Sequence, residues 1–157
     1  MTYLREFDKT GHLLASIQAR MFVNSAKDGL PSYNFIKVFS FLEYTESLDK
    51  LSFLYGSISE QDIYASTVKK MNKVSGGSVF TENELHWMGY FYRAFCYVTG
   101  WSSKETFRYI SPSYLRRVYV PYHSLSIEKA IKMVVNELKL PEENDQDKIM
   151  RILRATN

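Results

Sequence analysis

Apolar residues recur at helical spacing along most of this chain, and the clearest case lies between residues 81 and 99. Thr81 and Glu84 have the spacing of a capping box, in which each side chain accepts a hydrogen bond from the other residue's backbone N–H. Gly100 is suited to the left-handed conformation that closes many helices. A helix that is apolar over much of its circumference is normally central to its domain. Two adjacent apolar faces run along this segment, made by Leu85, Met88, Tyr92, Phe95 and Val98, and by Trp87, Phe91 and Ala94.

Shorter helices are predicted before and after this central one, because capping residues precede further apolar residues at helical spacing. The chain has only seven Gly and four Pro, which favours helices over a turn-rich β fold. We therefore expect an all-α, compact single domain over residues 1–157, with six to eight helices around helix 81–99. The other segments are a run from Leu13 that ends at Gly29, a helix opened by Pro31 and Ser32, a short helix over 45–51, a helix started by a capping box at 57–60, helices over 102–110 and 113–119, a helix capped by Ser124 or Ser126, and a last helix over 147–154.

Two places interrupt this helical pattern. Two adjacent glycines, Gly76 and Gly77, lie within residues 74–79, where we expect a flexible joint between helical halves that share one core. The Gly-x4-Gly-Lys-Ser/Thr pattern of a phosphate-binding loop is absent there. Val120 precedes Pro121, a position that disfavours helix, so residues 118–120 are predicted to be a short extended piece.

Composition narrows the class of protein. The 157 residues suit one domain, and 15% aromatic residues indicate a core built largely from rings. The net charge of +3, from 20 basic and 17 acidic residues, is too small to indicate nucleic-acid binding by itself. No stretch reaches the ~18 apolar residues of a membrane span, and the first residues do not have the pattern of a signal peptide. We expect a soluble cytoplasmic protein with no membrane partner.

Residues with the spacing of known catalytic or metal sites are not found. The three histidines, His12, His86 and His123, are far apart in the sequence, and no Cys-x2-Cys pair exists. Cys96, the single cysteine, lies inside an apolar helix, where a thiol is a poor nucleophile. Dinucleotide, nucleophile-elbow and kinase motifs are also absent. We therefore expect no catalytic residue, metal or cofactor, and a protein that is not an enzyme.

Some polar residues nevertheless stand out. Arg93 is the only formal charge between Glu84 and Lys104, so its head either pairs with an internal carboxylate or grips an acidic partner among aromatic rings. His123 follows Pro121 and Tyr122, where it either binds a nearby backbone group or belongs to a site. An enzyme centred on Arg93, Tyr122 and His123 stays a third alternative. The candidate partner-binding residues are Arg93, Arg116, Arg117, Tyr119, Tyr122 and His123.

A nucleic-acid site is the main alternative to a protein-binding site. Basic residues outnumber acidic ones between residues 93 and 117, and tyrosines lie among them, a combination that single-strand binders use. The succession of helix, Gly-containing turn and Ser-capped helix also resembles a helix-turn-helix in outline, with helix 104–109 as the groove-reading element. The candidate nucleic-acid contacts are Lys104, Arg108, Arg116 and Arg117.

Several short motifs resemble those of a little-characterised bacterial family, over roughly residues 16–130. Members of that family resemble companions of toxin-like genes, including genes for ADP-ribosyltransferase-like toxins, in small operons of the toxin–antitoxin type. The resemblance implies an antitoxin-like, inhibitory or accessory protein that acts on a toxin or on a defence or phage factor, and it brings no active-site residue with it. The motifs are Gln18-Ala19-Arg20-Met21-Phe22, Trp87-Met88-Gly89-Tyr90-Phe91-Tyr92-Arg93, Ser102-Ser103-Lys104-Glu105 and Tyr122-His123-Ser124-Leu125.

Overall fold

The computed structural model describes residues 1, 3–71, 76–141 and 149–153, and every regular element in these ranges is a helix. The all-α expectation is therefore confirmed. None of the described helices is long and apolar enough to cross a bilayer. The elements are α1 (Lys9–Lys27), α2 (Ser32–Phe41), the 3₁₀ helix η1 (Glu43–Thr45), α3 (Glu46–Asp49), the 3₁₀ helix η2 (Ser52–Leu54), α4 (Glu60–Lys70), α5 (Glu82–Thr99), α6 (Ser103–Tyr109), α7 (Pro112–Tyr122) and α8 (Ile127–Leu138), with residues 149–153 also helical.

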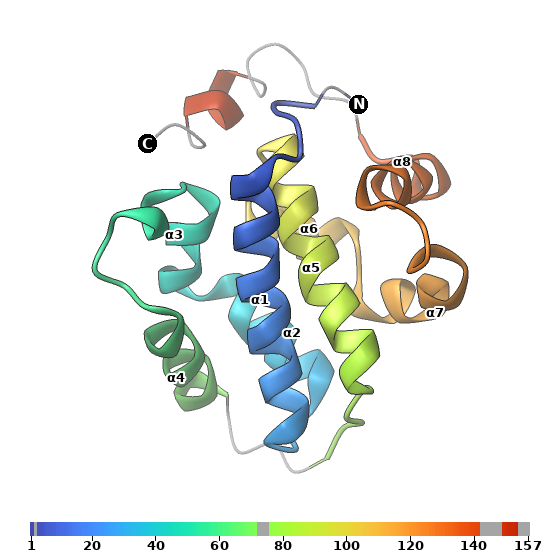
Figure 1. Ribbon diagram of the computed structural model, residues 1–157. Helices are drawn as coiled ribbons and strands as arrows, with labels where there is room; N and C mark the ends of the chain where they lie inside the picture. The colour runs from blue at the N-terminus through green and yellow to red at the C-terminus, as the bar shows by residue number, and fades with distance from the viewer. Residues whose placement is uncertain (2, 72–75, 142–148, 154–157) are drawn as a thin grey trace.

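Helices α1 and α5 lie side by side at the centre of the molecule, with α3 and α4 on one side and α7 and α8 on the other (Figure 1). Gly89 allows this close approach. A Cβ atom there would lie 2.9 Å from the Ala19 Cα atom and 3.0 Å from the Gln18 carbonyl oxygen, both backbone atoms of α1. Because backbone cannot yield as a flexible side chain does, a larger residue at position 89 would push the two central helices apart.

The ends of α5 are those predicted from the capping residues. The Thr81 hydroxyl accepts from the Glu84 N–H at 3.1 Å, and the Glu84 carboxylate accepts from the Thr81 N–H at 3.0 Å. Gly100 has φ +76° and closes the helix. Ser102 and Glu105 form the second predicted box, at the start of α6. These local signals therefore define the bounds of the central helix.

Aromatic rings join the two halves of the chain in one core. The Phe22 ring of α1 meets the α2 rings of Phe35 and Phe39 edge-on, with centroids 5.7 and 5.3 Å away. It also lies 6.4 Å from the ring of Tyr92 on α5. The buried apolar cluster that contains these rings extends to Ile131 on α8. Residues before and after the predicted joint thus pack into a single core.

Only part of the predicted joint at 74–79 can be compared with the structure, because residues 74 and 75 lie outside the described residues. Gly76 and Gly77 have φ values of +105° and +116°. The segment that follows is attached to α2: the Ser78 carbonyl accepts from the Ser32 N–H at 3.0 Å, and the Phe80 N–H donates to the Ser32 hydroxyl at 2.8 Å.

The extended piece predicted at 118–120 is wrong, because α7 continues through Pro121 to Tyr122. Proline at position 121 leaves the Arg117 carbonyl without its helical donor, and both residues are exposed, so water can reach that carbonyl. Val118 and Tyr122 are both buried, one turn apart. Their burial favours continued helix over the break that the local Val-Pro sequence predicts.

Two smaller differences concern helix ends. The capping box before α4 is formed by Ser59 and Asp62, and not by Ser57 and Glu60, because Ser59 is the residue with extended backbone immediately before the helix. The last predicted helix, 147–154, is helical over 149–153, and its remaining positions lie outside the described residues.

Candidate functional site

Arg93 is a core residue, with its side chain 1% exposed and its three guanidinium nitrogens each donating to a different helix. Nε donates to the Gln18 amide oxygen of α1, Nη1 to an Asp49 carboxylate oxygen of α3, and Nη2 to the Ser103 hydroxyl of α6, all at 2.7 Å. The first of the two alternatives for Arg93 is therefore correct, and its internal carboxylate is Asp49. This arginine is not available to a partner at the surface.

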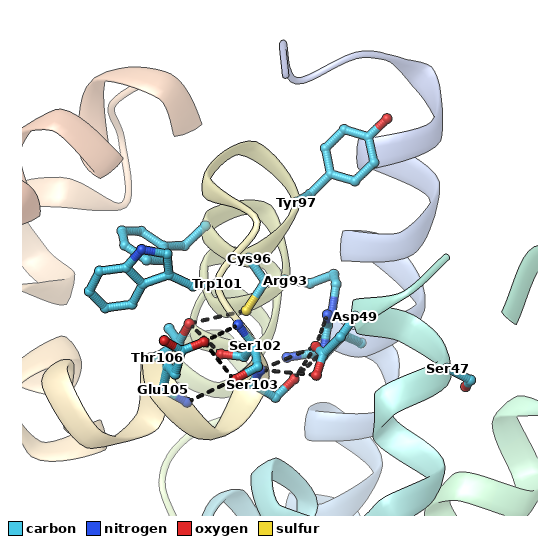
Figure 2. Close-up of polar contacts among 12 residues, drawn as sticks. Ser47, Asp49, Arg93, Cys96, Tyr97, Trp101, Ser102, Ser103, Glu105 and Thr106 are labelled. Carbon is cyan, nitrogen blue, oxygen red and sulfur yellow. Dashed lines mark hydrogen bonds and ion pairs between the residues drawn. The ribbon is translucent and has the colours of Figure 1, made fainter. Parts of the chain in front are cut away.

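The Asp49 carboxylate is as fully engaged as the arginine it faces (Figure 2). It also accepts from the Ser103 hydroxyl at 2.7 Å and from the Ser103 backbone N–H at 3.1 and 3.2 Å. Ser103 is the first residue of α6, so the acceptor satisfies a helix N–H that has no partner within its own helix. The network thus ties α1, α3, α5 and α6 together and leaves its charges paired.

Sequence reasoning missed Gln18, Asp49 and Ser103 as partners of Arg93. Gln18 carried a local signal, because a polar residue in the apolar stripe between Leu14 and Phe22 must find a buried partner. Asp49 carried none, since it lies among other acidic residues and 44 positions from Arg93.

Cys96 lies one turn after Arg93 and is fully buried, as expected. Its sulfur lies 3.2 Å from the Thr106 hydroxyl (Figure 2). Burial, opposed by the nearby positive charge of Arg93, raises the pKa of the thiol to about 11. The thiol is therefore protonated near neutral pH and is a poor nucleophile.

Tyr122 and His123 do not join Arg93 in one pocket. The Tyr122 hydroxyl donates to the Glu137 carboxylate of α8 at 3.0 Å. His123 is exposed, with Nδ1 2.7 Å from the Tyr119 carbonyl oxygen, the backbone contact weighed among the sequence alternatives. The hollow that His123 lines does not include Arg93. The three residues of the enzyme alternative are therefore engaged in separate contacts.

Arg116, Arg117, Tyr119 and His123 are brought together, along the side of α7 that faces α5 and solvent. The Arg116 Nε donates to the Glu84 carboxylate at 3.1 Å. One turn further, the Tyr119 ring meets the edge of Trp87, with centroids 5.9 Å apart. We call this line of contact the α5–α7 groove.

Two hollows open along this groove, with volumes of about 490 and 410 Å³. We call them the arginine hollow and the histidine hollow. The arginine hollow is lined by Tyr33, Ser78, Phe80, Glu84, Ser113, Arg116 and Arg117. The histidine hollow is lined by Asn83, His86, Trp87, Tyr90, Tyr119, His123, Leu125 and Ile127.

The histidine hollow is formed mainly by rings. Tyr119 and His123 stack with centroids 4.2 Å apart and planes 12° apart. On α5, the Tyr90 hydroxyl lies 2.6 Å from the His12 Nδ1 atom, so this hydroxyl has a partner on α1. The described residues contain no group of three or more His, Cys, Asp or Glu side chains placed to hold a metal ion. The hollow therefore suits an apolar or aromatic group.

The two α6 residues of the nucleic-acid alternative lie apart from the groove. Arg108 sits over the Phe41 ring, with its guanidinium carbon 5.5 Å from the centroid. Arg108 and Tyr109 are exposed on α6, whereas Lys104 is only partly exposed and the remaining residues are at least half-buried. A groove-reading helix needs three or four side chains that reach base edges, so α6 offers little surface for that role.

A further hollow of about 560 Å³ lies between residues 3–7, Val98 and α8, and none of the candidate binding residues lines it. Its Arg5 side chain is engaged within the fold: Nη1 donates to the Tyr97 carbonyl at 2.8 Å. The Leu4 and Arg5 N–H groups both donate to the Val98 carbonyl. Residues 4 and 5 therefore donate to backbone carbonyl groups near the C-terminal end of α5, which is a structural role.

Comparison with known proteins gives no relative: no protein-family model, curated protein or solved structure matches the chain.

Proposed function

We propose that this chain is a non-enzymatic protein-interaction module, an antitoxin-like or inhibitory component that binds a partner protein through the α5–α7 groove. The partner is a toxin or a defence or phage factor, in keeping with the family resemblance. The observation that carries the proposal is the grouping of Arg116, Arg117, Tyr119 and His123 beside two adjacent hollows.

The residue types in the groove support a protein partner. Arginine and aromatic residues are enriched among the side chains that dominate binding energy at protein interfaces. Arg116 and Arg117 offer donors to an acidic group, and the stacked rings of Tyr119 and His123 offer an apolar surface next to them. A segment with an acidic side chain followed by an apolar or aromatic one would match both hollows.

Co-purification with the product of the neighbouring gene tests this proposal. We expect the wild-type chain to bind that product and to reduce its toxicity in a growth assay. Charge reversal in the groove, Arg117→Glu, should weaken both effects. The matched control is Lys129→Glu, an exposed residue of α8 outside both hollows. A wild-type chain that neither binds the product nor alters its toxicity contradicts the proposal.

A nucleic-acid-binding regulator is the second candidate, and one feature favours it. A row of three rings connects Arg108 to the arginine hollow. Arg108 lies over the Phe41 ring, and the centroid of that ring is 5.7 Å from the centroid of Phe107. The Phe107 centroid is in turn 5.8 Å from that of Tyr33. Tyr33 is 47% exposed and lines the hollow with Arg116. Cations next to exposed rings are what single-strand binding uses.

Binding to single-stranded oligonucleotides at several salt concentrations separates the two candidates. A nucleic-acid binder loses affinity steeply as salt rises, because bound phosphates release counterions. Under this alternative, Arg108→Ala and Arg116→Ala each weaken binding and reduce the salt dependence. Binding that is unchanged in both variants excludes the row of rings and cations as the site.

A further inference from the structure

The arginine hollow contains more hydrogen-bond donors than the fold itself uses. Arg116 donates from Nε to Glu84, and its Nη1 and Nη2 atoms donate to no residue in the described ranges. The Arg117 guanidinium likewise donates to none of them, and it lies 5.4 Å from the Tyr114 ring centroid. Tyr33 and Ser113, two residues whose side chains carry a hydroxyl group, line the same space.

The single carboxylate in the hollow is already committed. One Glu84 oxygen accepts from the Thr81 N–H at 3.0 Å and the other from Arg116 at 3.1 Å. Burial by itself raises the pKa of Glu84, but the hydrogen bonds from Thr81 and Arg116 outweigh it and hold that pKa below its ordinary value. Glu84 is therefore ionised at neutral pH and balances Arg116, and Arg117 gives the residues that line the hollow a net positive charge. The Glu137 carboxylate of α8 does not line the hollow, but it also interacts with the charge of Arg117.

The walls of the hollow hold Arg116 in a defined orientation. Its guanidinium carbon lies 4.4 Å from the centroid of the Phe80 ring. Phe80 is 6% exposed, and its N–H donates to the buried Ser32 hydroxyl of α2 at 2.8 Å. A guanidinium fixed between a ring and a carboxylate loses little further freedom when a ligand binds, which favours affinity.

We propose that the arginine hollow binds a phosphoryl group carried by a side chain of the partner protein, an inference that rests on the proposed function. A phosphoryl group has three acceptor oxygens and a charge of about −1.5 to −2 at neutral pH. The unused guanidinium donors and the hydroxyls of Tyr33 and Ser113 can serve several of those oxygens. A carboxylate has fewer acceptor oxygens and a smaller negative charge, so it would engage fewer of these donors.

Titration of the ¹⁵N-labelled full chain with N-acetyl-O-phosphoserine amide tests this inference by NMR. The comparison probes are inorganic phosphate and N-acetyl-glutamate amide, at matched ionic strength. We expect saturable amide shifts over residues 78–84 and 111–117 with the phosphoserine probe, and binding at least about tenfold weaker with the glutamate probe. Inorganic phosphate that binds more tightly than phosphoserine would point to a free anion and overturn the side-chain source.

Variants locate the site. Arg117→Ala should weaken phosphoserine binding by about tenfold or more, since it removes a charge-assisted contact. Ser113→Ala should weaken phosphoserine binding by a smaller factor. Because it removes no charge, it also tests the site if Arg117→Ala proves unstable. The matched control is Arg108→Ala, another exposed arginine over a ring but outside the hollow. Shifts that do not saturate, or that are equal in wild type and Arg117→Ala, overturn the inference.

Partner binding distinguishes failure of this inference from failure of the proposed function. A chain that binds the neighbouring gene product equally well before and after phosphatase treatment retains the proposed function and excludes the phosphoryl ligand. A chain that binds phosphoserine in the hollow but not that product retains the anion site and excludes the proposed partner.

Discussion

Two arginine–carboxylate pairs, each with one member on α5, have the same chemistry and opposite surroundings. In the first pair, Arg93 Nη1 lies 2.7 Å from Asp49 Oδ1, and the two side chains are 1% and 6% exposed. In the second pair, Arg116 Nε lies 3.1 Å from Glu84 Oε2, and the two side chains are 42% and 16% exposed. In the buried pair every guanidinium nitrogen has a protein acceptor, whereas in the exposed pair two nitrogens donate to none of the described residues. The first pair therefore organises the fold, and the second is able to receive a ligand.

The largest expected effect comes from breaking the buried pair. Arg93→Ala leaves Asp49 as an uncompensated buried charge, which costs about 3–5 kcal/mol of unfolding free energy. Urea denaturation followed by circular dichroism measures this loss. The double replacement Arg93→Met with Asp49→Leu should be less destabilising than Arg93→Ala, because it removes both charges. If Arg93→Ala costs no more than Arg116→Ala, the distinction between the two pairs is wrong.

The next effect comes from the serine that bridges the buried pair. Ser103→Ala removes an acceptor from Arg93 and a donor to Asp49, and an unsatisfied buried group costs about 1–3 kcal/mol. Ser113→Ala on α7 is the matched control, since Ser113 is exposed and its loss should stay within about 0.5 kcal/mol. Equal losses in the two variants, from the same denaturation experiment, would contradict the assignment of Ser103 to a buried network.

Breaking the exposed pair should have little effect on stability. Arg116→Ala is expected to cost about 0.2–1 kcal/mol, the usual range for ion pairs that water can reach. Its thermal unfolding should approach that of wild type in high salt, because salt screens exposed pairs more than buried ones. A loss as large as that of Arg93→Ala would show that Arg116 is essential to the fold and would weaken its assignment to a binding surface.

The smallest effect is a pH dependence of the exposed pair. The pKa of Glu84 lies below its ordinary value, because hydrogen bonds from Thr81 and Arg116 outweigh the effect of burial. A carboxyl group with a depressed folded-state pKa stabilises fully above its unfolded pKa of about 4.3, and this contribution is lost as pH falls through the folded-state value. Unfolding free energies measured at pH 6 and pH 3.5 should therefore differ less in Glu84→Gln than in wild type. An identical difference in both would exclude this contribution.

Local signals predicted the helices well and the long-range pairs poorly. The capping residues Thr81 and Gly100 act within a few positions of themselves, so the bounds of α5 follow from neighbours in the sequence. The same local reasoning failed at Pro121, where burial of Val118 and Tyr122 on either side kept α7 helical. A local preference is reliable only where tertiary packing does not oppose it.

The candidate site shows the same division. Residue type and proximity in the sequence single out Arg116, Arg117, Tyr119 and His123, which line the two hollows from α7 and from its C-cap position. The sequence does not indicate their neighbours across the groove, since the capping role of Glu84 by itself accounts for that residue. Tyr33 and Phe80 are also distant in the sequence from α7, and no repeat or spacing connects them to it.

By itself, the sequence determined an all-α fold, the ends of its central helix and the side chains with unusual chemistry, because helical period and caps act within about four residues. The tertiary structure alone decided which carboxylate each arginine faces, at separations of 44 residues for Arg93 and 32 for Arg116. A chain with 17 acidic residues offers many such pairings, and only the packing of helices around α1 and α5 selects among them. That selection buried one arginine and left the other open to a ligand.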